Sequence, residues 1–389
     1  MKDFVFNVDT KIIFGENQLS ELGKEIKKYG KKVLLCYGGG SIKKNGIYDD
    51  ITGELKKDGI EYVELSGIEP NPRVDSAREG LKIARENKVD FILAVGGGSV
   101  VDLAKLISGA YYLDVDPWQV VLDSSKIEKA LPIGVVLTIA ATGTEMDPFS
   151  VITNLETKEK LSFASDLVLP VFSFMNPKYT FTVPEKHTVA GVCDIMSHTM
   201  ENYFSLGDGC YFQNKLSEGL LKTCIKYGPI LKKDPKNYEA RANIMWASTW
   251  AINGLLDSGK STSWSVHPME HELSAFFDIT HGTGLAILTP RWLEHCLDEE
   301  RQETIGNFAR NVFDVKEEED DLKAAKEGIK KLYEFFESLG VPMSLRQVGI
   351  EEDKLKEMAD LAVEHAGGKI KGFKTLYGED VYQIYKASF

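Results

Sequence analysis

Asp90-Phe-Ile-Leu-Ala-Val-Gly-Gly-Gly-Ser-Val-Val-Asp102 is the segment that most directly indicates the fold class. Its first part, residues 90–95, is an apolar run suited to a strand of a sheet that is covered on both faces. Three glycines and a serine follow at once, where a helix is expected to begin. A parallel strand that passes through a glycine turn into a helix is a unit of an α/β sheet, and its backbone amides and helix dipole can hold a phosphate.

A second stretch repeats this arrangement: Tyr37-Gly-Gly-Gly-Ser-Ile-Lys-Lys44 follows an expected strand at 32–37. Neither loop matches G-x-G-x-x-G, because Lys43 and Val101 occupy the last glycine position, and neither has the Gly-Lys-Ser/Thr ending of a Walker A motif. Each triple glycine taken singly is either a tight turn or a phosphate site. Two of them at matching sheet positions favour a dinucleotide site.

Residues 1–180 alternate between short β-branched runs and amphipathic helical patterns, which predicts an α/β domain with a mostly parallel sheet of non-standard Rossmann type. Further strands are expected at 132–138 and 170–175, and a hairpin is expected between 151–153 and 160–163. The segment Thr138-Ile-Ala-Ala-Thr-Gly-Thr-Glu145 places Thr138 and Thr142 after a strand. These two hydroxyls either contact phosphate or ribose, or only shape a turn.

The pattern changes after Pro184 to long helical periodicity, which predicts an all-helical domain. We therefore expect two domains, residues 1–183 and residues 184–389. The acidic stretch Glu317–Asp321 is interpreted as a solvated loop and helix start, since acids favour the first turn. The expected helices are 212–231, 238–257, 268–277, 283–297, 301–313, 321–338 and 352–366.

Composition excludes several classes of protein. Apolar residues make up 43% of the 389, but none of the runs reaches the eighteen or so apolar residues of a membrane span. The start of the chain lacks the pattern of a signal peptide. A net charge of −13 argues against a nucleic-acid surface. The five cysteines are odd in number and show no CxxC pair, as expected of reduced thiols in the cytoplasm.

Asp194, His198, His267 and His281 describe a divalent metal site split between two helical segments. Asp194 and His198 are four residues apart in a helix that proline opens, so both side chains face the same way. The segment His267-Pro-Met-Glu-His271 repeats this spacing, and His281 follows ten residues later. Three imidazoles and one carboxylate suit Fe(II) or Zn(II).

Other interpretations of these histidines remain open. Either pair at i, i+4 can arise by chance, and Asp194 with His198 can be an ordinary hydrogen bond on a helix. Residues 267–271 also match H-x-x-E-H, the inverted zincin motif of metallopeptidases, in which Glu270 would activate water. That function would leave the glycine loops unexplained.

The cofactor loops favour NADP(H) over NAD(H), although NAD(H) stays possible. Sites selective for NAD usually place an acid on the adenosine 2′-hydroxyl, whereas a 2′-phosphate needs cations or backbone donors. The first loop has no acid and carries Lys43 and Lys44. Two lysines at a helix start are also often just solvated.

Together these motifs resemble the iron-containing alcohol dehydrogenases, and within them the NADP-dependent butanol and aldehyde-reducing branch. The resemblance rests on Gly96–Asp102, Thr138-x-x-x-Thr142-Gly-x-Glu145, Asp194-x-x-x-His198, and His267-Pro-x-x-His271 with His281-Gly282, and it covers nearly the whole chain. It implies an N-terminal dinucleotide domain, a C-terminal helical metal domain, a homodimer, and an alcohol or aldehyde as the small-molecule substrate. The family name does not decide between iron and zinc.

Site residues follow from the resemblance position by position. It assigns Asp194, His198, His267 and His281 to the metal. The pyrophosphate would lie on Gly96, Gly97, Gly98 and Ser99, with Asp102 near the nicotinamide-side ribose. The adenosine ribose would lie among Gly38, Gly39 and Ser41, and Thr138, Thr142 and Lys160 would line the rest of the cofactor groove.

The implied chemistry is hydride transfer between nicotinamide and the carbon of a short-chain primary alcohol or aldehyde, with the metal as a Lewis acid. His271 lies one helical turn from His267 and is interpreted as a proton relay or substrate-positioning group, or as a structural histidine behind the metal. The alternatives are a non-catalytic nucleotide-binding protein and an enzyme similar to glycerol dehydrogenase or dehydroquinate synthase.

Overall fold

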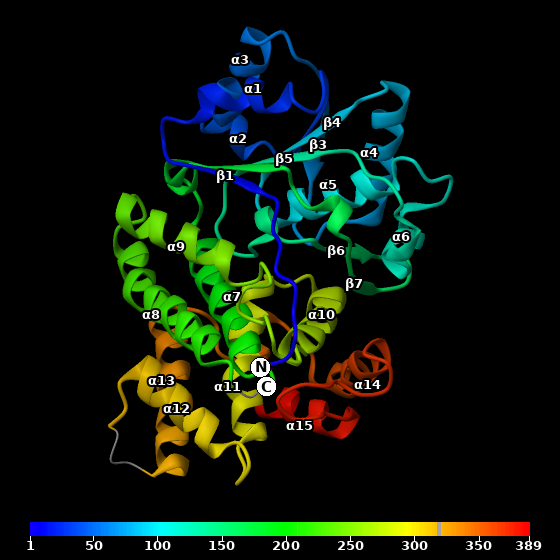
Figure 1. Cartoon of the computed structure of the whole chain (residues 1–389). Coiled ribbons are helices and arrows are strands. Elements are labelled where there is room, and N and C mark those ends of the chain that lie inside the picture. The colour runs from blue at the N-terminus through cyan, green and yellow to red at the C-terminus, as the bar shows by residue number, and fades with distance from the viewer. Residues whose placement is uncertain (208, 317–319) are drawn as a thin grey trace. The chain divides into compact units, whose positions relative to one another are not determined.

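The structure, a computed structural model, describes residues 1–207, 209–316 and 320–389. The chain divides into two compact units (Figure 1). One unit is Asn7–Val183, and the other joins Met1–Phe6 to Pro184–Phe389. The first unit is α/β with a parallel sheet and the second is helical, which confirms the predicted fold class. Residues 1–6, which the sequence placed with the first domain, therefore pack with the helical unit.

The α/β unit is built on a six-stranded parallel sheet in the order β1-β8-β5-β4-β2-β3. A separate antiparallel hairpin, β6–β7, confirms the hairpin expected from the sequence. The strands are β1 Lys11–Phe14, β2 Lys32–Gly38, β3 Glu61–Ile68, β4 Phe91–Gly96, β5 Ile133–Leu137, β6 Phe149–Asn154, β7 Glu159–Ala164 and β8 Phe172–Met175. The helices of this unit are α1 Leu22–Ile26, α2 Ser41–Lys44, α3 Ile47–Lys57, α4 Val74–Glu86, α5 Gly98–Ala110 and α6 Pro117–Leu122.

Strands β2 and β4 are buried on both faces, as their uninterrupted apolar sequences require. Alternate residues of the two strands, among them Val33, Leu35 and Leu93, lie in one apolar cluster with residues of α1 and α3. The residues between them, such as Leu34 and Ile92, are equally buried on the other face. Covering both faces holds the two strands rigidly, and with them the glycine loops at their carboxyl ends.

The order of the strands reverses between β2 and β4. From β2 the chain adds β3 on one side, then crosses to the other side of β2 to form β4. Such a point leaves a crevice outside the carboxyl ends of the two strands, where open α/β sheets bind their ligands. The loops Gly38–Gly40 and Gly96–Gly98 both lie at this edge of the sheet.

The second unit consists of helices joined by turns and loops of varied length. Its helices are α7 Glu185–Tyr203, α8 Tyr211–Lys233, α9 Tyr238–Trp250, α10 Val266–Phe277, α11 His281–Cys296, α12 Gln302–Phe313, α13 Asp321–Ser338, α14 Leu355–His365 and α15 Gly378–Ala387. Helix α7 packs against both α8 and α11, and α10 packs against α11. Two stretches far apart in the sequence, α7–α8 and α10–α11, thus meet at the middle of this unit (Figure 1).

The predicted helix 238–257 is too long. Helix α9 ends at Trp250, and turns follow it. The side chain of Asn253 accepts a hydrogen bond from the backbone N–H of Leu255, and Gly254 has a φ of +89°, so the backbone leaves the helical conformation there. The apolar spacing on which the prediction relied continues through these turns although the helix does not.

The acidic stretch Glu317–Asp321 is described only in part. Asp320 caps α13, because its side chain accepts a hydrogen bond from the backbone N–H of Lys323. This agrees with the expected helix start, while residues 317–319 lie outside the described residues. Among the helices that the structure describes, none has both the length and the apolar character needed to cross a membrane.

Candidate active site

Helix α7 places Asp194 and His198 on one buried face. Both side chains are almost completely buried, and Nε2 of His198 lies 3.6 Å from Oδ1 of Asp194. The four-residue spacing alone produces this neighbourhood. A carboxylate and an imidazole side by side in the core of a unit form a donor pair of the kind that can bind a metal.

Helices α10 and α11 bring His267 and His281 to the same place. One ligand atom from each of Asp194, His267 and His281 lies within 4.8 Å of the others. Nε2 of His281 lies 3.9 Å from Oδ1 of Asp194, and the rings of His198 and His267 stack with centroids 4.7 Å apart. The structure thus brings together all four residues that the sequence assigned to a metal.

Gly282 explains how α11 comes so near to α7. A Cβ at this position would lie 2.0 Å from the backbone oxygen of Ala190 on α7, so only glycine fits the contact. His281 is the first residue of α11, and the close approach carries its ring towards Asp194. The dipeptide His281-Gly282 therefore combines a candidate ligand with the residue that positions it.

The donor set fits a divalent metal. One carboxylate oxygen and imidazole nitrogens are ligands of the type that Fe(II) and Zn(II) take in proteins. Burial lowers the pKa of His198 well below its ordinary value, with a smaller contribution from His267. His198 is therefore neutral, and the neutral ring is the form that binds a metal.

Two buried carboxylates lie behind these histidines. Sequence reasoning missed Glu201, and it considered Glu270 only as the glutamate of the peptidase alternative. Oε1 of Glu201 lies 3.2 Å from Nδ1 of His267, and Oε2 of Glu270 contacts Nδ1 of His281. Burial raises the pKa of Glu201 to about 7, against the effect of three backbone N–H groups that donate to it. Sequence spacing gave no signal for these contacts, because the histidine that each glutamate follows by three residues is not the one that it contacts.

The position of Glu270 argues against a peptidase. Its side chain is fully buried, and it contacts His281 and the hydroxyl of Ser274. A zincin needs this glutamate to face the metal-bound water and activate it. In this chain Glu270 lies behind His281, on the Nδ1 side of the ring.

His271 and Trp264 border the proposed metal site. The ring of His271 lies 5.8 Å from that of His281 and 6.4 Å from that of His267, and it is only half-buried. The ring of Trp264 lies 4.5 Å from that of His267 and 5.3 Å from that of His198. His271 offers a partly exposed titratable ring, and Trp264 offers an aromatic surface. Together they suit a small substrate that carries a polar and an apolar end.

In the α/β unit, the second glycine loop has no room for side chains. A Cβ at Gly98 would lie 2.7 Å from Cγ2 of Thr142, and one at Gly97 would lie 3.1 Å from Cβ of Ile139. The backbone N–H of Thr138 donates to the backbone oxygen of Gly96. The structure therefore brings the segment 138–142 against the start of α5, as a shared cofactor groove requires.

Asp102 is held by the hairpin side of the unit. Its Oδ1 accepts a hydrogen bond from the hydroxyl of Thr144 at 2.7 Å, and its Oδ2 accepts one from the backbone N–H of Val151 at 3.0 Å. The side chain is nine-tenths buried. Lys160, the other charged residue assigned to the cofactor, is buried on β7 opposite Thr153.

The first glycine loop is more open than the second. Nothing lies within 4 Å of a Cβ built at Gly39, and Gly40 has a φ of +94°, which favours glycine. Ser41 is exposed at the start of α2. Lys43 lies over the rings of Tyr37 and Tyr48, and its Nζ is 3.5 Å from Glu64.

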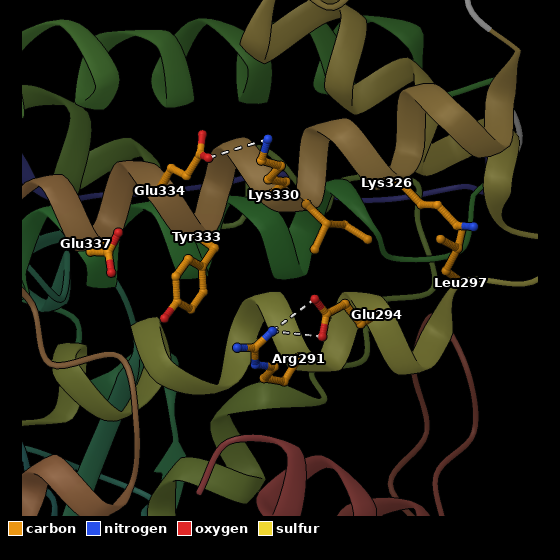
Figure 2. Close-up of a pocket in the computed structure, with 9 residues that line it drawn as sticks. Arg291, Glu294, Leu297, Lys326, Lys330, Tyr333, Glu334 and Glu337 are labelled. Carbon is orange, nitrogen blue, oxygen red and sulfur yellow. Dashed lines mark hydrogen bonds and ion pairs between the residues drawn. The ribbon is translucent and has the colours of Figure 1, made fainter.

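A surface pocket of about 690 Å³ between α11 and α13 holds none of the predicted site residues (Figure 2). Four of its six charged side chains pair with one another: Arg291 with Glu294, and Lys330 with Glu334. Tyr333 lies under the guanidinium of Arg291. Because most of its charges pair with one another and none of the predicted site residues lines it, we do not regard this pocket as the active site.

Comparisons with known proteins match the whole chain. Residues 9–177 match the model of the family described as "Iron-containing alcohol dehydrogenase", and residues 188–389 match "Fe-containing alcohol dehydrogenase family, C-terminal". The chain is 51% identical to NADH-dependent butanol dehydrogenase A of Clostridium acetobutylicum over 389 residues, covering 100% of both proteins. It is 38% identical to the NADPH-dependent aldehyde reductase YqhD of Escherichia coli over 368 residues, covering 94% of each.

Solved structures agree in fold. The crystal structure of NADH-dependent butanol dehydrogenase A from Thermotoga maritima superposes with a TM-score of 0.94 at 41% identity, covering 100% of this chain and 99% of that one. That of Escherichia coli YqhD superposes with a TM-score of 0.95 at 34% identity and the same coverage.

Proposed function

The chain belongs to the iron-containing alcohol dehydrogenase family, and from this membership we propose that it transfers hydride between a nicotinamide cofactor and a short-chain primary alcohol or aldehyde. The observation that carries the proposal is the convergence of Asp194, His198, His267 and His281 in the helical unit. The printed names of the relatives, butanol dehydrogenase and aldehyde reductase, support the substrate class.

We propose that these four residues hold one divalent metal, Fe(II) or Zn(II). Bound there, it would act as a Lewis acid on the oxygen of the aldehyde or alcohol. His198 contributes a ring that burial keeps neutral, and Asp194 contributes the negative charge of the donor set. Trp264 closes one side of the site and excludes water beside His267.

His271 is proposed as the group that exchanges the substrate proton with solvent. Its ring is close to His281, and it is partly exposed, so a proton can pass from a substrate oxygen to water through it. The neighbouring ring of Trp264 orients the apolar end of the substrate. A purely structural role for His271 is the alternative, and a substitution described in the Discussion separates the two.

The cofactor is assigned to the α/β unit, residues 7–183, within the domain expected at 1–183. The pyrophosphate would lie on the backbone of Gly96, Gly97, Gly98 and Ser99 at the amino end of α5, where N–H groups and the helix dipole favour an anion. Thr138 and Thr142 lie beside this loop. Gly38, Gly39 and Ser41 would surround the adenosine ribose. Asp102 and Lys160 would act from the hairpin side.

Between the two dinucleotides we propose NADP(H), with NAD(H) as the alternative. The open space at Gly39 and the absence of an acid between residues 38 and 44 support it. Against it stand the names of the 51% identical relatives, which specify NADH, and the pairing of Lys43 with Glu64. The kcat/KM values for NADPH and NADH decide the point: a lower value for NADPH would contradict the proposal.

We also propose a cytoplasmic homodimer. All five cysteines are buried as reduced thiols, which supports a reducing compartment. The molar mass in solution, measured by light scattering, tests the dimer, and a mass near 43 kDa would contradict it.

The decisive experiment measures oxidation of NADPH and NADH with a series of aldehydes of increasing chain length. The protein is stripped of metal and then reloaded separately with Fe(II) or Zn(II). We expect activity only after reloading, with short aliphatic aldehydes as substrates. Equal activity in the stripped protein would contradict the metal site, and no activity with any aldehyde or alcohol would contradict the proposed reaction.

A further inference from the structure

Two buried carboxylates, Glu201 and Glu270, each hold one histidine of the proposed metal set from behind. We propose that both are positioning residues, which fix the tautomer and orientation of His267 and His281 so that Nε2 of each ring faces the metal. The inference rests on the metal site of the proposed function and adds two residues to it. Neither glutamate belongs to the four proposed ligands.

Glu270 is fixed at both of its oxygens. Its Oε2 contacts Nδ1 of His281, and its Oε1 accepts a hydrogen bond from the hydroxyl of Ser274. Gly284, on α11, leaves the space that the side chain fills, because a Cβ there would lie 2.7 Å from Cγ of Glu270. Because this carboxylate is fully buried and both of its oxygens are held, its own position is fixed. It therefore sets the orientation of the His281 ring.

Glu201 does two things at once. Its Oε2 accepts from the backbone N–H of Ser265 at 2.9 Å, and its Oε1 accepts from those of Val266 at 2.7 Å and His267 at 3.1 Å. These N–H groups lie at the start of α10. The N-cap residue of this helix, Ser265, does not cap them with its own side chain. The same Oε1 faces Nδ1 of His267. The start of the helix and the ring are thus fixed by one side chain of α7.

The chemical consequence is the same at both histidines. When Nδ1 carries the proton and donates a hydrogen bond to a carboxylate, the lone pair lies on Nε2, which is the nitrogen that a metal can bind. The carboxylate also makes the ring a stronger donor. In His281 this Nε2 is the nitrogen that lies 3.9 Å from Asp194, on the side of the proposed site.

Glu272 offers a matched control on the same helix. It is as buried as the other two, and its Oε1 contacts Nδ1 of His365 at 2.7 Å. His365 lies on α14 and is not among the proposed ligands. A substitution at Glu272 therefore breaks the same type of buried contact without touching the metal set.

The test measures the dissociation constants of Zn(II) and Co(II) for the full chain by competition with a chelator, together with the absorption spectrum of the Co(II) form. We compare the wild type with Glu270→Gln, Glu270→Ala and Glu201→Gln, and with Glu272→Gln and Glu272→Ala. We expect 10- to 100-fold weaker binding at 270 and 201, about the range found for such partners elsewhere. At 272 the change should stay within about twofold.

The two glutamates should also differ from each other. An amide at 201 points a donor at one of the N–H groups that open α10, so Glu201→Gln should lower the Tm of the metal-free protein. Glu270→Gln keeps an acceptor for His281 and should lower that Tm much less. Wild-type affinity in both Glu270 variants, or an equal loss at Glu272, would overturn the inference. A wild-type chain that binds neither metal would overturn the metal site itself, and this inference with it.

Discussion

Nζ of Lys105 lies 2.9 Å from Oδ1 of Asp147, and both side chains are almost completely buried. The same nitrogen donates to the hydroxyl of Thr144 and to the backbone oxygens of Asp147 and Phe149. Helix α5 is thereby tied to the segment that leads into the β6–β7 hairpin. Because α5 begins at the second glycine loop, this buried ion pair helps to hold that loop of the proposed cofactor groove in place.

Replacing Lys105 with methionine should destabilise the α/β unit strongly. Asp147 would be left as a buried charge without its cation, and removing one partner of a buried pair costs about 3–5 kcal/mol. Unfolding in urea, followed by circular dichroism, measures the loss. Lys57→Met is the control, because Lys57 is an exposed lysine in an i, i+3 pair and should change the unfolding free energy by less than about 0.5 kcal/mol. Similar losses for both variants would contradict the prediction.

The stability of the chain should carry a pH dependence that belongs to Asp102. Burial raises the pKa of Asp102 to about 6, partly opposed by Lys105, whereas an unfolded aspartate titrates near about 3.9. A raised pKa means that the folded chain binds the proton more tightly. The contribution of this group is therefore most favourable below about pH 4 and is lost as the pH rises to about 6, by about 3 kcal/mol in total.

Asp102→Asn isolates this effect, because asparagine does not titrate. The difference in unfolding free energy between wild type and variant should fall as the pH rises from about 4 to about 6.5. Denaturation curves at a series of pH values give that difference. A difference that stays constant over this range would show that Asp102 is not the titrating group.

Gly98→Ala should weaken cofactor binding more than it weakens the fold. The new methyl group would lie 2.7 Å from Cγ2 and 2.8 Å from the hydroxyl of Thr142, so the loop or the threonine must move. We expect the KM for the nicotinamide cofactor to rise about tenfold, measured by initial rates. Gly53→Ala, in α3 with nothing within 4 Å, should leave KM unchanged and stabilise the chain by about 0.5–1 kcal/mol. An unchanged KM in Gly98→Ala would remove this loop from the cofactor site.

His271→Ala should lower kcat by about 100-fold, a typical contribution of a positioned acid or base, while bound metal stays near one per chain. Metal analysis of the purified variant and initial rates of aldehyde reduction measure the two quantities. His295→Ala provides the comparison, since His295 pairs with Asp380 on another part of the helical unit. Loss of metal from His271→Ala would place His271 among the ligands and contradict a role as proton relay.

Much of the fold was predictable because its signals are local. The strands around residues 33–37 and 91–95 are apolar without interruption, and the glycines that follow them mark the turns into helices. The end of α9 was not predictable in this way. Its apolar spacing runs on beyond Trp250, and only the turn conformation at Asn253 and Gly254 ends the helix.

The candidate site also has some residues that local spacing could predict and others that it could not. The spacing of Asp194 and His198 is a property of one helix, so sequence suffices to place them together. Glu201 follows His198 by three residues but contacts His267, and Glu270 follows His267 by three but contacts His281. Each carboxylate serves a histidine of another segment, and such pairing depends on how α7, α10 and α11 pack. No spacing within one segment contains that information.

The first six residues have a bearing on the order in which the chain can fold. The backbone N–H of Lys2 donates to the oxygen of Gly259, so the start of the chain is built into the helical unit. Topologically, Asn7–Val183 is an insertion between two pieces of that unit. During synthesis, residues 7–183 can complete their sheet before most helices of the helical unit have been made. A fragment that begins at Pro184 would lack the segment that pairs with Gly259, whereas an excised Asn7–Val183 would lose nothing of its own sheet.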